Sequence, residues 1–337
     1  MKKACFVILL SFLLCCKTEK PLEKNIAVGE AMGTTYAITY FAKGQVDLQN
    51  EIESVFAEVY QSMSTYIPNS DISRINSGDS TIVVDDMFKK VFEVSKKVHK
   101  ASNGYFDPTV GVLVNAWGFG PGESIILDST KVDSLLQFVG FDKVSLTKKG
   151  RIKKLNPAIE FDFNAVAKGY SIDLLGNLLD ERGYKNYLVE VGGEILTKGT
   201  NVLSGKRWTV GIDNPTDLSY RGSAAVVSLE NKALASSGNY RKFRIDERTG
   251  EKYVHSVDPK TGYTKNSNVL ATTVLAKDCA SADAFATAFM VMELEDTKAY
   301  LKSDKDVDAF IIFIGDDGTT QSYMTPGFEN SLVRMGF

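Results

Sequence analysis

Short strand-like segments crowd the second half of this chain, and their spacing constrains the fold more than any other feature. Each is rich in β-branched or aromatic residues and is bounded by turn-forming residues. A helix is expected at 279–292, between the last two of the long strands. Strands that cluster with helices between them favour an α+β fold. The expected strands of this half are 187–191, 194–198, 208–212, 224–229, 233–236, 243–246, 253–257, 268–275, 307–314 and 321–324.

The first half of the chain is mainly helical in pattern. Apolar residues recur at helical spacing over 52–63, and Asp86 is expected to cap a second helix. A third helix is expected from about 165 to 181. Strands are expected only at 34–42 and 81–84. No Pro/Gly/Ser-rich linker or repeat interrupts this pattern, so residues 26–337 are interpreted as one catalytic domain.

Composition excludes several classes of protein. The 337 residues are 44% apolar and 24% charged, as in a globular protein. The net charge is −3 and no block of Lys or Arg dominates, so nucleic-acid binding is not expected. The two histidines, His99 and His255, are too few for a His-rich metal site. His99, among lysines at a helix end, is expected to be solvated.

The N-terminus has the pattern of a secretion signal. Lys2 and Lys3 precede an apolar stretch that is too short to span a bilayer. It ends Leu-Leu-Cys-Cys, which is typical of a bacterial lipoprotein signal. Residues 1–15 are therefore interpreted as the signal peptide, Cys16 as the lipidated residue, and 16–25 as the lipidated cysteine with a polar, flexible tether. Cys15 is the less favoured lipid site, and an ordinary cleaved signal is the alternative.

This interpretation also decides how the cysteines are used. Cys279 is then the only cysteine of the catalytic domain, so no disulfide is expected within it. We expect a membrane-anchored lipoprotein of the bacterial cell envelope whose domain lies in the periplasm.

Two glycine-containing turns are candidates for ligand binding. In the segment 162–170, Asp-Phe-Asn-Ala-Val-Ala-Lys-Gly-Tyr, a strand end leads into a helix whose first N–H groups suit a phosphate. Lys168 lies in the first turn, where a cation opposes the helix dipole unless a ligand supplies negative charge. Gly192-Gly193 follows a buried strand and allows a ligand to approach closely. A plain helix start and a β-bulge are the structural alternatives.

A third candidate surrounds His255. The segment 236–241 is Ser-Ser-Gly-Asn-Tyr-Arg, and His255 begins His-Ser-Val-Asp-Pro-Lys-Thr-Gly, which contains a turn. His255 is expected on a strand beside this glycine-containing loop. A packing role and a functional role are equally compatible with that position.

Asp283 and Thr287 are the candidate metal ligands. They are four residues apart on an alanine-rich helix, so both lie on one face. A carboxylate and a hydroxyl suit Mg²⁺, which usually takes one or two carboxylates together with phosphate and water oxygens. The alternative is an exposed Asp and a Thr that bonds to its own helix.

An aromatic, glycine-rich stretch could hold a planar ring. It includes Gly-Tyr-Phe-Asp-Pro-Thr-Val-Gly at 104–111 and Asn-Ala-Trp-Gly-Phe-Gly at 115–120. Aromatic side chains of this kind either wall a ligand pocket or pack in the core.

Together and in this order, the segments resemble the ApbE family, the FAD:protein FMN transferases. The resemblance starts at Met32-Gly33-Thr34-Thr35-Tyr36 and extends to the helix of Asp283 and Thr287. It differs from the common family pattern at 162–165, at Glu194 after the paired glycines and at Asn239. The motifs that match are 107–111 with 117–120, 167–170, 192–193, 237–240, 255–262 and 282–287.

The resemblance implies a single α+β domain of mixed or antiparallel sheets with packed helices. It implies a transferase that moves the FMN half of FAD onto a threonine hydroxyl of an acceptor protein and releases AMP. Mg²⁺ would be held by Asp283, Thr287 and the backbone carbonyl of Ala165. The FAD site would be lined by Met32, Tyr66, Tyr105, Phe106, Asp107, Asp162, Lys168 and Val257.

Some questions remain open at the level of the sequence. His255 and Asp283 are both candidates for the catalytic base, and a metal-bound Asp is the poorer one. The alternatives to transfer are an Mg-dependent FAD pyrophosphatase and a non-catalytic flavin-binding lipoprotein. Tyr66 resembles the tyrosine of transferring members and favours transfer. Acceptors are expected among subunits of membrane electron-transfer complexes.

Overall fold

The computed structural model describes residues 20–216, 223–239, 243–245, 252–265 and 267–336. The signal peptide, Cys16 and most of the predicted tether therefore lie outside the described residues. Within them, no helix is both long and apolar enough to cross a membrane. The mixed helices and mostly antiparallel sheets confirm the α+β prediction.

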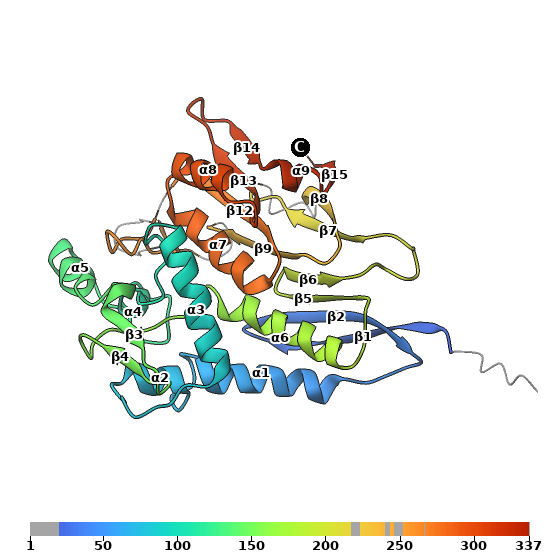
Figure 1. The fold of residues 1–337 in the computed structure, drawn as a ribbon. Coiled ribbons are helices and arrows are strands. Elements are labelled where there is room, and N and C mark those ends of the chain that lie inside the picture. Colours follow the sequence, from blue (N-terminus) through green and yellow to red (C-terminus); the bar gives the residue numbers. More distant parts are fainter. Residues whose placement is uncertain (1–19, 217–222, 240–242, 246–251, 266, 337) are drawn as a thin grey trace, which may run out of the picture.

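One large antiparallel sheet organises the molecule (Figure 1). Its strand order is β1-β2-β5-β6-β9-β12-β13-β14, so the segments predicted in both halves of the chain join one sheet. The strands are β1 (Leu22–Ala31), β2 (Thr34–Lys43), β5 (Tyr187–Val191), β6 (Glu194–Lys198), β9 (Ala233–Gly238), β12 (Val269–Ala276), β13 (Asp308–Ile314) and β14 (Thr320–Met324).

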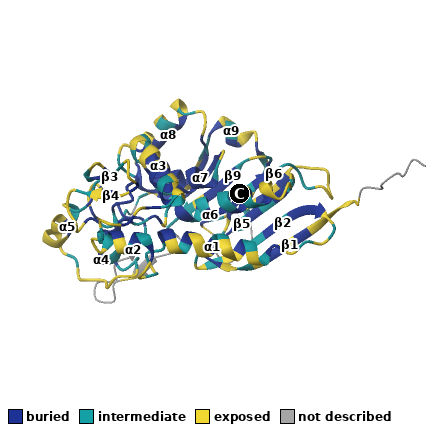
Figure 2. Ribbon diagram, turned by 60° about the horizontal axis from the view of Figure 1, so that its bottom comes forward, coloured by how far each residue is buried: buried dark blue, intermediate teal, exposed yellow. Residues whose placement is uncertain are grey.

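Helices cover one face of this sheet, and the apolar side chains between them form the main core. The central helix α7 packs on β9 and β12 and against α6 and α3, while α1 packs on α6. Figure 2 shows α7 as almost entirely buried. The helices are α1 (Gln49–Met63), α2 (Asp71–Asn76), α3 (Asp86–Ala101), α4 (Gly111–Ala116), α5 (Ser129–Leu136), α6 (Ala167–Glu181), α7 (Cys279–Val291), α8 (Leu294–Ser303) and α9 (Pro326–Glu329).

Smaller sheets complete the fold. A three-stranded sheet of order β15-β8-β7 contributes to a second core with the side chains of β6, β12 and β13. Two two-stranded sheets, β3-β4 and β10-β11, lie outside the large sheet. Their strands are β3 (Val144–Leu146), β4 (Ile152–Lys154), β7 (Trp208–Asp213), β8 (Ser223–Leu229), β10 (Phe243–Ile245), β11 (Lys252–Val254) and β15 (Leu332–Met335).

Three local predictions need correction. The tether was predicted to reach residue 25, but β1 already begins at Leu22 because its polar residues pair with β2 and bury Asn25. The helix predicted to be capped by Asp86 is capped instead by Asp85, whose side chain accepts a bond from Phe88 N–H. The strand predicted at 81–84 is absent, since its one cross-connection is Val84 N–H to the Gly150 carbonyl.

Candidate active site

The start of α6 carries the charge centre of the site. This helix has no side-chain cap at its N-terminus. Lys168 in its first turn places Nζ 2.6 Å from Oε1 of Glu194, and the two side chains are 27% and 3% exposed. Burial lowers the pKa of Lys168, but the negative charges of Glu194 and Asp283 outweigh this effect. The pKa therefore lies above its usual value and the ammonium stays charged.

Asp283, on α7, faces the same turn of α6. Gly169 N–H donates to Asp283 Oδ2 over 3.0 Å. In a continuous helix this amide would bond to the carbonyl of Ala165, four residues earlier. The bond therefore brings the Asp283 carboxylate to the turn that contains Ala165. A Cβ at Gly169 would lie 2.4 Å from the carbonyl oxygen of Cys279, so only glycine lets α6 approach α7 this closely.

Glu194 and Asp283 form a pair of buried carboxylates, 2% and 4% exposed. Burial raises the pKa of both groups, and the charge of Asp283 raises the pKa of Glu194 further. Glu194 Oε2 is buried without a hydrogen-bond partner among the described residues. A buried charged oxygen is costly unless a donor or a cation completes it. We call Lys168, Glu194 and Asp283 the acid–lysine cluster.

Thr287 extends this cluster along α7. Its Oγ1 lies 3.4 Å from Oγ of Ser237 on β9. Asp283, Thr287 and the carbonyl of Ala165 are all hard oxygen donors of the kind that Mg²⁺ prefers. The described part of the chain has no group of three or more His, Cys, Asp or Glu placed to hold a metal. Substrate and water oxygens would therefore complete the shell, and the unpartnered Glu194 oxygen beside Asp283 fits a cation there.

A second group of predicted residues lies along the aromatic stretch. Tyr66 is 59% exposed, and its hydroxyl lies 3.5 Å from the carbonyl oxygen of Phe119. Burial and then the charge of Asp162 raise the pKa of Tyr66, so these two residues are neighbours. Asp162 N–H donates to the Pro108 carbonyl over 2.7 Å. Three segments far apart in the sequence therefore meet just before α6.

The buried Asp107 carboxylate stabilises the aromatic stretch by accepting hydrogen bonds. Its Oδ1 accepts bonds from the N–H and the hydroxyl of Thr109, and its Oδ2 accepts one from Phe141 N–H. The same carboxylate lies 3.5 Å from Nδ1 of His99, which also contacts the carbonyl of Phe106 at 2.9 Å. His99 was predicted to be solvated, and this is wrong, because its ring lies against the folded loop.

The aromatic stretch packs against the loop that follows β11. Nζ of Lys260 lies 3.7 Å from the centre of the Tyr105 ring. Trp117 Nε1 donates to the Gly262 carbonyl over 2.8 Å, and buried Val257 belongs to the same small core as Trp117. We call the side chains of Tyr66, Tyr105, Trp117 and Phe119, of which Trp117 is buried, the aromatic wall.

His255 is placed at the edge of this loop. It lies one residue beyond the end of β11, half-buried, so it is not on the strand as predicted. Tyr240 and Arg241 of the neighbouring motif lie outside the described residues. The catalytic role of His255 stays a prediction.

Met32 joins the site through its backbone. It occupies the turn between β1 and β2 with φ of 54°, and its N–H donates to the Tyr60 hydroxyl over 2.5 Å. Gly192 N–H donates to the Thr35 carbonyl. The β1–β2 turn therefore lies beside the β5–β6 turn. Glu194 directly follows the β5–β6 turn. Strand pairing thus places Met32 near the acid–lysine cluster.

The sequence analysis did not select two residues of this region, Glu194 of the cluster and Asp173 beside it. Glu194 appeared there only as a departure from a motif, although a charged residue directly after paired glycines was a usable signal. Asp173 was missed. Its carboxylate accepts bonds from the N–H groups of Cys279 and Ala280, at the start of α7, over 2.7 and 2.9 Å.

Comparison with known proteins agrees with this geometry. A model of the ApbE family matches residues 32–311. The chain belongs to the ApbE family. The FAD:protein FMN transferase of Haemophilus influenzae is 33% identical over 322 residues, covering 92% of this chain and 91% of that protein. That of Vibrio cholerae is 34% identical over 336 residues, covering 97% and 98%.

Solved ApbE structures share the fold. The flavin transferase ApbE from Vibrio cholerae superimposes with a TM-score of 0.83 at 32% identity, covering 93% of this chain and 100% of that one. The apo form of the Pseudomonas stutzeri flavinyl transferase ApbE gives 0.81 at 28% identity, covering 92% and 97%. The family predicted from the ordered motifs is thereby confirmed.

Proposed function

We propose that this chain is a transferase that moves the FMN half of FAD onto an acceptor protein. The observation that carries the proposal is the acid–lysine cluster at the start of α6, in a chain whose family is ApbE. Relatives that match more than nine tenths of the chain are named FAD:protein FMN transferase. We propose further that the acceptor group is a threonine hydroxyl and that the reaction depends on Mg²⁺.

The proposed reaction exchanges one phosphate bond for another. The threonine oxygen forms a bond to the phosphorus of the FMN half, and the pyrophosphate bond breaks. AMP leaves with the electron pair, and the threonine proton passes to a base. Phosphoryl transfer of this kind needs positioning and charge neutralisation more than covalent help from the protein. Mg²⁺, when bound, would neutralise charge on the diphosphate.

The residues of the chain would divide this work. The charged Lys168 side chain, in the first turn of α6, would bind phosphate oxygens. Asp283, Thr287 and the Ala165 carbonyl would hold the cation, which makes Asp283 a poor base. We therefore propose His255 as the base.

We assign the flavin and adenine parts of FAD to the neighbouring surfaces. Tyr66, Tyr105 and the rest of the aromatic wall would face a planar ring, as aromatic side chains commonly do. The rest of the FAD site would be formed by the backbone and the loops that contain Met32, Phe106, Asp107, Asp162 and Val257.

We also propose a location and a class of partner. The N-terminal pattern supports export and lipidation at Cys16, so the domain would be anchored to a membrane of the cell envelope and lie in the periplasm. Acceptors must then expose their threonine on that side, and flavin-carrying subunits of membrane electron-transfer complexes fit this requirement.

The test uses the full chain with FAD, Mg²⁺ and a candidate acceptor from the cell envelope. Intact-mass spectrometry should show that the acceptor gains one FMN residue, while an acceptor with the target Thr→Val gains nothing. An unchanged acceptor with release of free FMN and AMP would replace transfer by pyrophosphatase activity. FAD that binds and is recovered intact would identify a non-catalytic flavin-binding protein.

A further inference from the structure

Four connections of the fold meet at the end of the large sheet that is remote from the site. Leu22 at the start of β1 pairs with Lys43 at the end of β2. Phe41 N–H bonds to the carbonyl of Asn186, and the Asn186 side chain accepts a bond from Thr200 N–H. The β6–β7 connection and the point where the chain enters β1 therefore lie at the same end of the sheet, with β2 and β5 between them. Both are at the right-hand side of Figure 1.

The β6–β7 connection presents apolar side chains to solvent. It is a closed turn, since Gly205 N–H donates to the Asn201 carbonyl over 2.8 Å. At its tip Leu203 is 71% exposed and Val202 is 36% exposed, and nearby Leu22 is 42% exposed. Neighbouring leucine and valine side chains this exposed at a rigid turn are suited to entering an apolar phase.

Exposed lysines lie at this end of the sheet: Lys24 of β1, Lys43 of β2, Lys185 and Lys206. Exposed acidic residues share it: Glu23, which accepts a bond from Gln45, Asp47 and Glu181. Lysines beside an apolar tip favour an anionic lipid surface. We call Leu22, Val202, Leu203 and these four lysines the tether-end surface.

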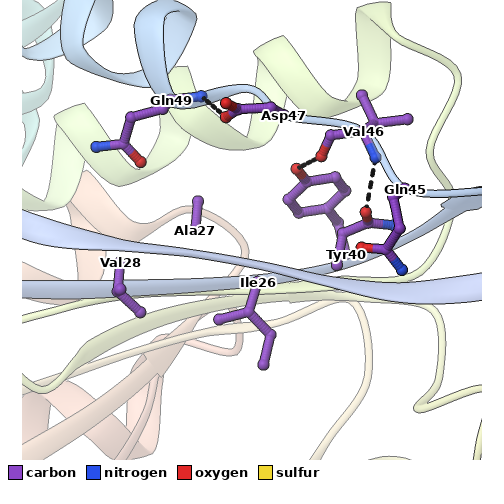
Figure 3. Close-up of a pocket in the computed structure, with 9 residues that line it drawn as sticks. Ile26, Ala27, Val28, Tyr40, Gln45, Val46, Asp47 and Gln49 are labelled. Carbon is purple, nitrogen blue, oxygen red and sulfur yellow. Dashed lines mark hydrogen bonds between the residues drawn. The ribbon is translucent and has the colours of Figure 1, made fainter.

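The chain geometry holds this surface near the membrane. Leu22 follows the proposed lipidated residue Cys16 by six positions, which span about 20 Å at most when fully extended. The start of β1 is itself firmly held, because the buried Asn25 side chain donates to the Gly44 carbonyl and accepts from Val46 N–H. Figure 3 shows a neighbouring bond, from the Tyr40 hydroxyl of β2 to the Val46 carbonyl. A short chain attached to a rigid point restricts how far the adjoining surface can turn away from the bilayer.

We propose that the tether-end surface docks on the anionic bilayer, with Leu203 and Val202 entering its interface. This inference rests on the proposed lipid anchor but not on the transfer reaction. β1 spans ten residues, or about 33 Å, from Leu22 to the turn that contains Met32. Docking would therefore hold the catalytic site up to about 30 Å from the membrane. Acceptor threonines within that height are the ones the site reaches.

The test places a reporter on the lipidated full chain. Leu203→Cys is labelled with an environment-sensitive dye, and Ile126→Cys, 62% exposed at the α5 side of the molecule, is the matched control. Among the described residues Cys279 is buried, so labelling there is suppressed. Vesicles contain phosphatidylglycerol and phosphatidylethanolamine, with or without a spin-labelled lipid that quenches emission at the interface.

Docking predicts a blue shift and strong quenching at position 203 and neither at 126. The shift should weaken in Lys24→Glu/Lys206→Glu and at high salt, while transfer to a soluble acceptor stays unchanged. Equal signals at 203 and 126 would overturn the proposal. So would quenching at Leu155→Cys instead, because Leu155 is 73% exposed beside the basic β3–β4 hairpin. N-terminal mass and acceptor flavinylation, measured separately, report the anchor and the reaction.

Discussion

The acid–lysine cluster and the aromatic wall lie next to each other but are built differently. Lys168, Glu194 and Asp283 come from two helices and a strand, and packing and backbone bonds hold them. Tyr66 and Tyr105 come from loops, and Tyr66 is largely exposed. Groups that neutralise charge need a dry, fixed position, whereas groups that hold a ring can adjust. The cluster should therefore control turnover and stability, and the wall should control affinity for FAD.

The largest effect is expected from Asp283→Asn. This change keeps the shape but removes the charge, so turnover should fall about a thousandfold. Binding of Mn²⁺, followed by electron paramagnetic resonance without FAD, should weaken as well. Wild-type turnover in this variant would show that the acid–lysine cluster takes no part in the reaction. It would contradict the proposed difference between the cluster and the aromatic wall.

Lys168→Met should be the most destabilising change. It leaves Glu194 and Asp283 as two buried acids without a cation, at a cost of about 3 kcal/mol in the free energy of unfolding. The double variant Lys168→Met/Glu194→Gln should recover most of this loss, because it also removes one acid. Urea titration measures all three proteins. Additive losses would show that the 2.6 Å contact carries no coupling energy.

Asp173 should make stability fall as pH rises. Burial raises the pKa of Asp173 to about 7, so the folded protein holds a proton that the unfolded chain releases near pH 4. Stability from this group is present below pH 4 and is lost as pH increases through 7. Relative to Asp173→Asn, the wild type should lose ~2 kcal/mol between pH 5 and 8. Parallel stability curves would contradict this linkage.

Tyr66→Ala should act on binding instead. Loss of an exposed ring surface should raise KM for FAD about tenfold while changing kcat and stability little. Tyr66→Phe, which keeps the ring, is the control and should bind almost normally. A loss in kcat without a change in KM would place Tyr66 with the chemistry and not with the wall.

The smallest effect is expected from Lys260→Met. Its ammonium lies over the Tyr105 ring at 3.7 Å, an arrangement worth about 0.5–1 kcal/mol. We expect a severalfold weaker FAD affinity, measured by fluorescence titration, with an unchanged melting temperature. An affinity equal to wild type would show that this contact does not order the wall.

Local patterns predicted much of this architecture. The helix of Asp283 and Thr287 was predicted, with both residues on one face, because helical spacing alone decides that. Its almost complete burial was not predicted, since alanine-rich helices occur both inside proteins and on their surfaces. The whole of β1 (Leu22–Ala31) was missed, and its start looks like a tether because Lys24 and Asn25 are polar until β2 pairs with them.

Contacts between residues far apart in the sequence could not be predicted from local patterns. The pairing of Lys168 with Glu194 depends on how α6 meets β6, and the role of Asp173 depends on how α6 meets α7. His99 looked solvated because its neighbours along the helix are lysines, whereas its actual partners come from the following loop. The family motifs predicted the candidate site, and the structure shows contacts among several of its residues.

The stoichiometry of AMP release tests the central claim most directly. The full chain, FAD, Mg²⁺ and an excess of acceptor are mixed, and AMP and acceptor-bound flavin are both followed over time. Our account predicts one AMP for each flavin attached, with no free FMN, and no AMP from Asp283→Asn. AMP that accumulates with free FMN while the acceptor stays unmodified would contradict flavin transfer as the function of this chain.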